Sequence, residues 1–257
     1  MPESFSPRLI LRRGPVWLAF ERPLRVLEAR RPEDAPAVIR QVEEATEREG
    51  LWAAGFLSYE AAPAFDSCLP SRPDPEGFPL LWFGLFGEPR EIPALPPPSA
   101  GFVPPAQWES SVAETDYHER LRAIRDYLAA GDTYQVNFTW RLRARAAACD
   151  PWEFFLHLMA PAAPPYAAYV DTGEWAICSA SPELLFRLEG DHIESRPMKG
   201  TAARGLWFED DERRAAALRQ SEKDRAENVM IVDMVRNDLG RIAFPGSVET
   251  PELFTVE

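Results

Sequence analysis

The pattern of apolar and polar residues predicts three short strands, one helix and two more strands in the first part of the chain. Pro36–Glu49 carries apolar residues at helical spacing, and Gly50 is expected to end this helix. Apolar runs bounded by turn residues predict the strands. These runs are Leu9–Arg12, Val16–Phe20, Leu24–Glu28, Trp52–Ser58 and Leu80–Phe86.

Prolines are concentrated between residues 89 and 105, where the sequence has seven of them. Proline fixes φ and lacks an N–H donor, so this stretch is expected to be a stiff, extended connector. The connector at 89–105 divides the chain into an N-terminal α+β region, residues 1–88, and a second region, residues 106–257.

The second region begins with a strongly periodic helix, Thr115–Ala130, which Gly131 is expected to end. Further helices are predicted at Trp152–Met159, Glu209–Gln220 and Lys223–Asp238. Strands are predicted at Tyr134–Ala144, Tyr166–Asp171 and Trp175–Ala180, and in a hairpin with arms Leu184–Leu188 and His192–Pro197. Long strands with flanking helices favour an α+β fold over a doubly wound parallel fold.

Composition and charge narrow the classes of partner. The formal net charge is −13, which disfavours binding to nucleic acid and to anionic membranes. There is no apolar run of membrane-helix length and no signal-peptide profile at the start of the chain. The three cysteines, Cys68, Cys149 and Cys178, lack metal-ligand spacing and suggest a reducing compartment. A cytoplasmic protein is therefore expected.

Two short stretches are candidates for chemistry. Glu183 follows a predicted strand end and a proline, where the commoner interpretation is a surface glutamate in a turn. Lys199 is followed by Gly200 and Thr201, so backbone donors could cradle an anion while the amine acts as nucleophile or cation. A solvated turn lysine is the ordinary alternative.

A third candidate lies on the last predicted helix. Asp224 and Glu227 are three residues apart and therefore share one helix face. Paired carboxylates of this kind suit Mg²⁺, which takes one or two of them together with waters and substrate oxygens. The alternative is an ordinary charged face on which these acids pair with Lys223 and Arg225.

Taken in order, these stretches resemble the chorismate-binding enzymes, which include anthranilate, aminodeoxychorismate, isochorismate and salicylate synthases. Leu57–Ala62 also resembles the N-terminal region of bacterial aminodeoxychorismate synthases. The resemblance implies a layered sandwich of antiparallel sheets with outer helices. Its blocks are Tyr134–Asn137, Ser181–Glu183, Pro197–Thr201, Asp224–Asp238 and Pro251–Phe254.

Two positions indicate a branch of this family. Lys199 stands where aminodeoxychorismate synthases carry a nucleophilic lysine and where anthranilate synthases typically carry alanine. Gln135 stands where water-using members have a water-activating lysine, so a glutamine there fits an ammonia user. The resemblance thus implies amination of chorismate at C4, on the route to para-aminobenzoate and folate. Anthranilate synthase component I is the alternative.

The resemblance also implies roles for the candidate residues. Mg²⁺, held by Glu227 and more weakly by Asp224, would bind the ring carboxylate of chorismate. Glu183 would protonate the departing C4 hydroxyl, and Lys199 would add covalently at C2. Gly200 and Thr201 would help to bind a substrate carboxylate.

The implied ammonia source is a glutamine amidotransferase subunit, because no cysteine of this sequence lies in a Gly-rich elbow with a downstream histidine. Free ammonia is the other source. The sequence also ends before the Gly-rich stretch and the second set of metal-binding glutamates of the family. We therefore expect this chain to be inactive alone, and an inactive partner-binding fragment is a third interpretation.

Overall fold

The computed structural model describes residues 9–72, 76–145, 149–161 and 164–256. The chain divides into two compact units. The first comprises residues 1–105 and 146–182, and the second comprises residues 106–145 and 183–257. The N-terminal region and a later part of the chain therefore build the first unit together.

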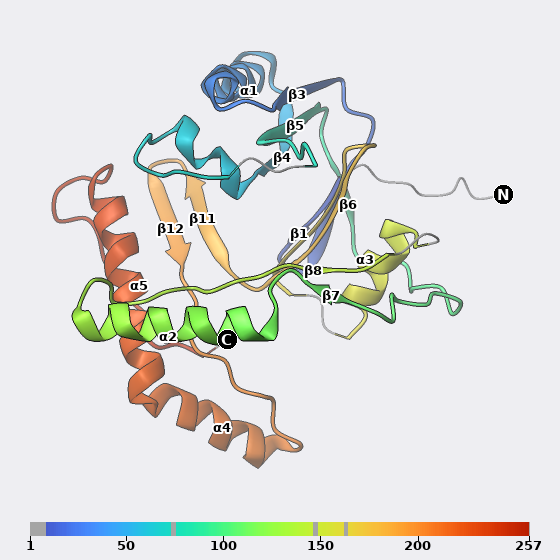
Figure 1. Cartoon of the computed structure of the whole chain (residues 1–257). Helices are drawn as coiled ribbons and strands as arrows, with labels where there is room; N and C mark the ends of the chain where they lie inside the picture. Colours follow the sequence, from blue (N-terminus) through green and yellow to red (C-terminus); the bar gives the residue numbers. More distant parts are fainter. Residues whose placement is uncertain (1–8, 73–75, 146–148, 162–163, 257) are drawn as a thin grey trace. The chain divides into compact units, whose positions relative to one another are not determined.

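The first unit contains two antiparallel sheets (Figure 1). The five-stranded sheet has the order β10-β9-β1-β2-β6, and the three-stranded sheet has the order β3-β5-β4. The five strands of the larger sheet are β1 (Leu9–Arg13), β2 (Val16–Phe20), β6 (Arg90–Ile92), β9 (Tyr166–Asp171) and β10 (Ala176–Ser181). Those of the smaller sheet are β3 (Arg25–Ala29), β4 (Trp52–Leu57) and β5 (Leu81–Phe86).

Side-chain alternation along the strands gives the larger sheet two apolar faces. Ile10 and Trp17 point to one face, where they form a core with Phe155 of α3 (Pro151–Met159). The neighbouring residues Leu9 and Leu18 point to the other face and pack in one cluster with residues of β4 and β5. The five-stranded sheet therefore lies between a helix and the smaller sheet.

The outer face of the smaller sheet is covered by α1 (Ala35–Glu49), whose Val38 packs in a third cluster with Ala29 and Leu81 (Figure 1). Two short 3₁₀ helices, Pro32–Asp34 and Tyr59–Ala64, flank this helix and strand β4. The order helix, sheet, sheet, helix confirms the predicted α+β sandwich of antiparallel sheets with outer helices.

The second unit contains three helices and two small antiparallel ribbons. The helices are α2 (Glu114–Ala130), α4 (Phe208–Gln220) and α5 (Glu222–Gly240). One ribbon pairs β7 (Glu109–Ser110) with β8 (Leu142–Arg143), and the other pairs β11 (Leu184–Glu189) with β12 (His192–Arg196). The predicted hairpin and the three predicted helices of this unit are thus confirmed, with ends shifted by up to two residues.

The predicted strand Tyr134–Ala144 is wrong over most of its length, because only Leu142–Arg143 pairs with another strand. Apolar alternation indicates an extended backbone with two different faces, whereas a strand also needs a hydrogen-bonding neighbour. Within residues 134–141, the side chains of Phe138 and Trp140 instead pack beside Tyr117 of α2, with ring centroids 5.7 and 5.3 Å away.

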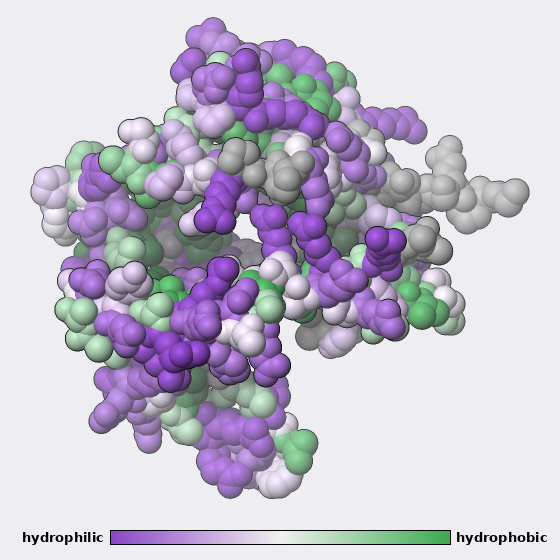
Figure 2. Space-filling view, in the orientation of Figure 1, coloured by the Kyte–Doolittle hydropathy of each residue, from purple (hydrophilic) through white to green (hydrophobic). Residues whose placement is uncertain are grey.

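The second unit buries little apolar surface. Among its described residues, Leu184 is the one buried apolar side chain, and it is still 9% exposed, whereas the first unit holds three buried clusters. Figure 2 shows apolar atoms at the surface near the start of α4, where Leu206 and Phe208 are 84% and 74% exposed. None of the helices in the described residues is long and apolar enough to cross a membrane.

Candidate functional site

The β11–β12 hairpin brings Glu183 beside the loop that carries Lys199. Leu184 pairs with Arg196 at the open end of the hairpin, so Glu183 and Pro197 leave the two strands side by side. The Glu183 carboxyl Oε1 accepts a hydrogen bond from the Met198 backbone N–H at 3.1 Å. Two stretches that are separate in sequence therefore meet, and the carboxyl group is fixed one residue from Lys199.

Lys199 is partly buried, and its Nζ donates a hydrogen bond to Oδ1 of Asn137 at 2.9 Å. Asn137 lies on the extended segment that follows α2, 62 residues earlier in the chain. Sequence reasoning did not single out Asn137, because this contact depends on how distant segments pack. Asn137 is thus the residue of the Tyr134–Asn137 block that bonds to Lys199.

Lysine is rare in this sequence, which also draws attention to Lys199. Lys199 and Lys223 are the only lysines in the sequence, and the other 26 of its 28 basic side chains are arginines. Arginine stays protonated in proteins, whereas lysine can become a neutral nucleophile. Lys199 is therefore one of only two side chains in this sequence that could supply a lysine amine as nucleophile.

Gln135 lies two residues before Asn137 in the same extended segment. Its side-chain Oε1 is buried and has no hydrogen-bond partner among the described residues. Buried polar atoms are nearly always paired, so an acceptor of this kind suits a small donor such as ammonia or water. In the described structure the Lys199 amine bonds to Asn137, and the Gln135 Oε1 accepts no hydrogen bond from it.

Gly200 brings the loop against the start of α5. Its φ is +80°, and a Cβ built on it would lie 3.0 Å from Cβ and 3.1 Å from Oδ1 of Asp224. A side chain at position 200 would therefore meet both backbone strain and the carboxyl group. Thr201 follows with an exposed side chain. The loop thus contacts Glu183, Asn137 and Asp224 within three successive residues.

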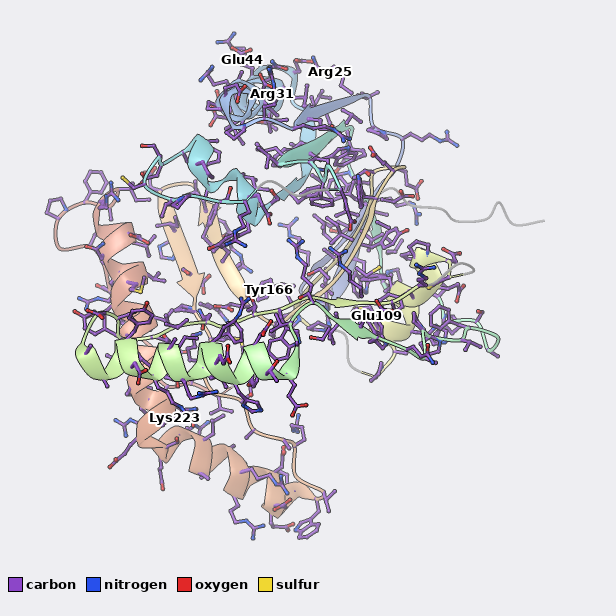
Figure 3. All side chains as sticks on the ribbon, viewed as in Figure 1. Arg25, Arg31, Glu44, Glu109, Tyr166 and Lys223 are labelled. Atoms are coloured by element: carbon purple, nitrogen blue, oxygen red, sulfur yellow. The ribbon has the colours of Figure 1, made fainter. Side chains whose placement is uncertain are left out.

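Helix α5 presents the two acids that the sequence suggested for metal binding. Ser221 caps the helix by accepting the Asp224 backbone N–H at 3.3 Å, which places Asp224 in the first turn. Glu227 lies almost one turn further on and forms an ion pair with Lys223 at 3.4 Å. Lys223 lies at the N-terminal end of the helix (Figure 3).

These acids supply at most two protein ligands. The described residues contain no group of three or more potential metal ligands. Two carboxylates fit Mg²⁺, which commonly keeps waters and substrate oxygens in its other positions. The Lys223–Glu227 ion pair also matches the alternative of an ordinary charged face, whereas Arg225 stacks over the ring of Phe254, 4.5 Å from its centroid.

Several curated proteins are similar to the chain. It is 41% identical to aminodeoxychorismate synthase component 1 of Escherichia coli (strain K12) over 160 residues, which are 62% of this chain and 35% of that protein. It is 39% identical to the protein of the same name from Bacillus subtilis (strain 168) over 144 residues, 56% of this chain and 30% of that protein. It is also 40% identical to anthranilate synthase component 1 1 of Haloarcula marismortui over 152 residues, 59% of this chain and 31% of that protein. The match thus spans about a third of the length of these relatives.

Solved structures share the fold. A putative 2,3-dihydroxybenzoate-specific isochorismate synthase from Bacillus anthracis aligns with a TM-score of 0.71 at 17% identity, over 97% of this chain and 64% of that chain. Anthranilate synthase component I from Streptococcus pneumoniae aligns with a TM-score of 0.68 at 20% identity, over 94% of this chain and 63% of that chain. The sequence profile of the family described as chorismate binding enzyme matches residues 12–257. The chain therefore belongs to the chorismate binding enzyme family.

Proposed function

We propose that this chain carries the nucleophile and the general acid of an enzyme that aminates chorismate at C4, giving 4-amino-4-deoxychorismate. The observation that carries the proposal is the lysine amine of Lys199, held by Asn137 in a loop that is fixed to Glu183. Relatives named aminodeoxychorismate synthase component 1 support the same branch of the family.

Lys199 would react as the neutral amine. Its nitrogen bonds to C2 of chorismate as the two ring double bonds shift, C1=C2 to C1=C6 and C5=C6 to C4=C5, and the C4–O bond breaks. Glu183 gives its proton to the departing hydroxyl, which leaves as water. The Met198 N–H can bond to the unprotonated oxygen of a carboxylic acid, so this contact orients Glu183 in either protonation state.

Ammonia then bonds to C4 while the C2–N bond breaks and its electron pair returns to Lys199. One proton of the new ammonium group restores the acid form of Glu183. The net reaction consumes chorismate and ammonia and yields aminodeoxychorismate and water. The buried Oε1 of Gln135 is a suitable acceptor for an N–H of the incoming ammonia.

Mg²⁺ bound by Glu227 and Asp224 would supply Lewis-acid polarisation of the substrate's ring carboxylate. Gly200 and Thr201 would offer backbone donors to a substrate carboxylate. Because the relatives are named component 1, we propose a second subunit, a glutamine amidotransferase, as the ammonia source. We also propose that the 257-residue chain alone does not turn over chorismate, since its match to those relatives covers only about a third of their length.

The second candidate function is that of anthranilate synthase component I, which relatives of that name support at 40% identity. The two functions differ in their products. Anthranilate forms with loss of pyruvate, whereas aminodeoxychorismate keeps the enolpyruvyl group. Identification of the product therefore separates them.

The test is product analysis by mass spectrometry with chorismate, Mg²⁺ and ammonium. The complete gene product, its Lys199→Ala variant and its Lys223→Ala variant are compared, since these are the two lysines of this sequence. We expect aminodeoxychorismate from the unaltered protein and from Lys223→Ala, and none from Lys199→Ala. Anthranilate as the product, or full activity of Lys199→Ala, would overturn the proposal.

A further inference from the structure

The loop that carries Lys199 runs directly into two neighbouring aspartates at the start of α4. Asp210 is 3% exposed and is the one fully buried charged side chain among the described residues. Its carboxylate accepts the Leu206 backbone N–H at 3.1 Å and bonds to Arg213 and to Arg214, the latter at 2.9 Å. A buried carboxylate with three partners is itself held in place, so Asp210 fixes the backbone at Leu206.

Asp211 holds the same stretch of backbone from the next position. It accepts the Gly205 N–H at 2.7 Å and accepts hydrogen bonds from Nε and Nη2 of Arg204 at 2.6 to 3.0 Å. Arg214 adds a hydrogen bond to the carbonyl of Ala203 at 3.4 Å. Four consecutive residues, 203–206, are thus attached to the first two turns of α4.

Gly205 shows how closely the loop lies on the helix. A Cβ built at this position would be 2.2 Å from the Asp211 backbone nitrogen and 2.6 Å from the Asp210 carbonyl carbon. Backbone atoms cannot move aside in the way that the end of a flexible side chain can. The contact therefore excludes any side chain at position 205.

The other end of the loop is fixed as well, because β12 ends at Arg196 and the Met198 N–H is bonded to Glu183. Lys199 lies between these two attachments, four residues before the clamped stretch begins at Ala203. We propose that Asp210, with Asp211, is a positioning residue that holds the 203–206 backbone and thereby keeps the Lys199 amine against Asn137.

The importance of holding the Lys199 amine in place rests on the proposed function, in which Lys199 is the reacting amine. The clamp, by which we mean the bonds that tie residues 203–206 to Asp210 and Asp211, can be tested without turnover of chorismate. The sequence has two lysines. Acylation of the chain by a limiting amount of acetic anhydride therefore measures the reactivity of the Lys199 amine, with the Lys223 amine as an internal reference. Lys223 has a 79% exposed side chain, whereas Lys199 is partly buried and bonded to Asn137.

We expect Asp210→Asn to raise the Lys199-to-Lys223 labelling ratio by about fivefold, the factor that one typical net hydrogen bond represents. Glu212→Gln, which removes an exposed acid from the same helix, is the matched control and should leave the ratio unchanged. An unchanged ratio in Asp210→Asn, with circular dichroism equal to that of the unaltered chain, would overturn the inference. If Asp210→Asn does not fold, Asp211→Asn gives the same test.

The complete gene product provides a second readout. Loss of positioning predicts a fall in kcat for Asp210→Asn, accompanied by a rise in KM, because Gly200 and Thr201 lie on the same loop as Lys199. A rise in KM alone would contradict a positioning role. If the labelling ratio responds while Lys199→Ala retains activity, the clamp is correct and the proposed function is wrong.

Discussion

Replacement of Asn137 by aspartate tests whether the residue that accepts the Lys199 hydrogen bond controls the reactivity of this amine. The two side chains have the same size and differ in charge, so the variant places a carboxylate where Oδ1 now lies 2.9 Å from Nζ. A neighbouring anion stabilises the ammonium form and withdraws the electron pair that the reaction needs.

The magnitude follows from the geometry and the exposure of the pair. Opposite charges at about 4 Å attract by about 4 kcal/mol near a protein surface and by about 1 kcal/mol in water. Asn137 is exposed and Lys199 partly so, so solvent screening favours the lower figure. About 1 kcal/mol reduces the fraction of free amine at neutral pH by roughly fivefold.

The assay is again competitive acylation, with Lys223 as reference. Asn137→Asp should lower the Lys199 labelling rate by roughly fivefold at neutral pH, and the deficit should shrink as the pH rises. Asn137→Ala removes the acceptor without adding charge, so it should not slow labelling. Equal or faster labelling of Lys199 in Asn137→Asp would show that Asn137 does not control this amine.

Two further predictions concern stability. Phe155 is fully buried against Trp17 and Tyr169, with ring centroids 6.0 and 5.5 Å away, so Phe155→Ala should cost about 3–5 kcal/mol in urea unfolding of the first unit; a loss below about 1 kcal/mol would contradict this packing. The Leu206 N–H holds the pKa of Asp210 below its usual range, and Arg204 does the same for the pKa of Asp211. Depressed carboxyl pKa values stabilise the fold above the unfolded aspartate pKa of about 3.9, and this stability is lost as the pH falls further. Thermal melts from pH 6 to pH 3 should therefore show less acid destabilisation in an Asp210→Asn, Asp211→Asn double variant than in the unaltered chain.

Local signals in the sequence were enough to predict most helices and the β11–β12 hairpin. Helical periodicity and a following glycine located α1 and α2, both of which end at a residue before a left-handed glycine, Gly50 and Gly131. Strand pairing was harder, since it depends on distant partners. Residues 90–92 lie in the proline-rich stretch yet form β6 beside β2, where Ile92 pairs with Trp17.

Local motifs also indicated some of the residues that lie around Lys199, and the roles of these residues stay predictions. Motif order pointed to Glu183, Lys199, Gly200 and Asp224, and the structure brings these four together through one hairpin and one helix start. The sequence could not predict that Asn137 would meet Lys199. An asparagine on an extended segment has no local feature that identifies its partner 62 residues away.

The second unit has little apolar core, and this affects how firmly the Lys199 loop is held. Among its described residues only Leu184 is a buried apolar side chain, so the loop that carries Lys199 is held by hydrogen bonds and ion pairs, not by an apolar core. Each such contact stabilises the loop by only about 1 kcal/mol net, because water competes for the same groups. Under the proposed function, part of the binding free energy of the substrate carboxylate would be used to order this loop. The Asp210 clamp lowers that cost, because it has already fixed the residues that follow Lys199 before any ligand arrives.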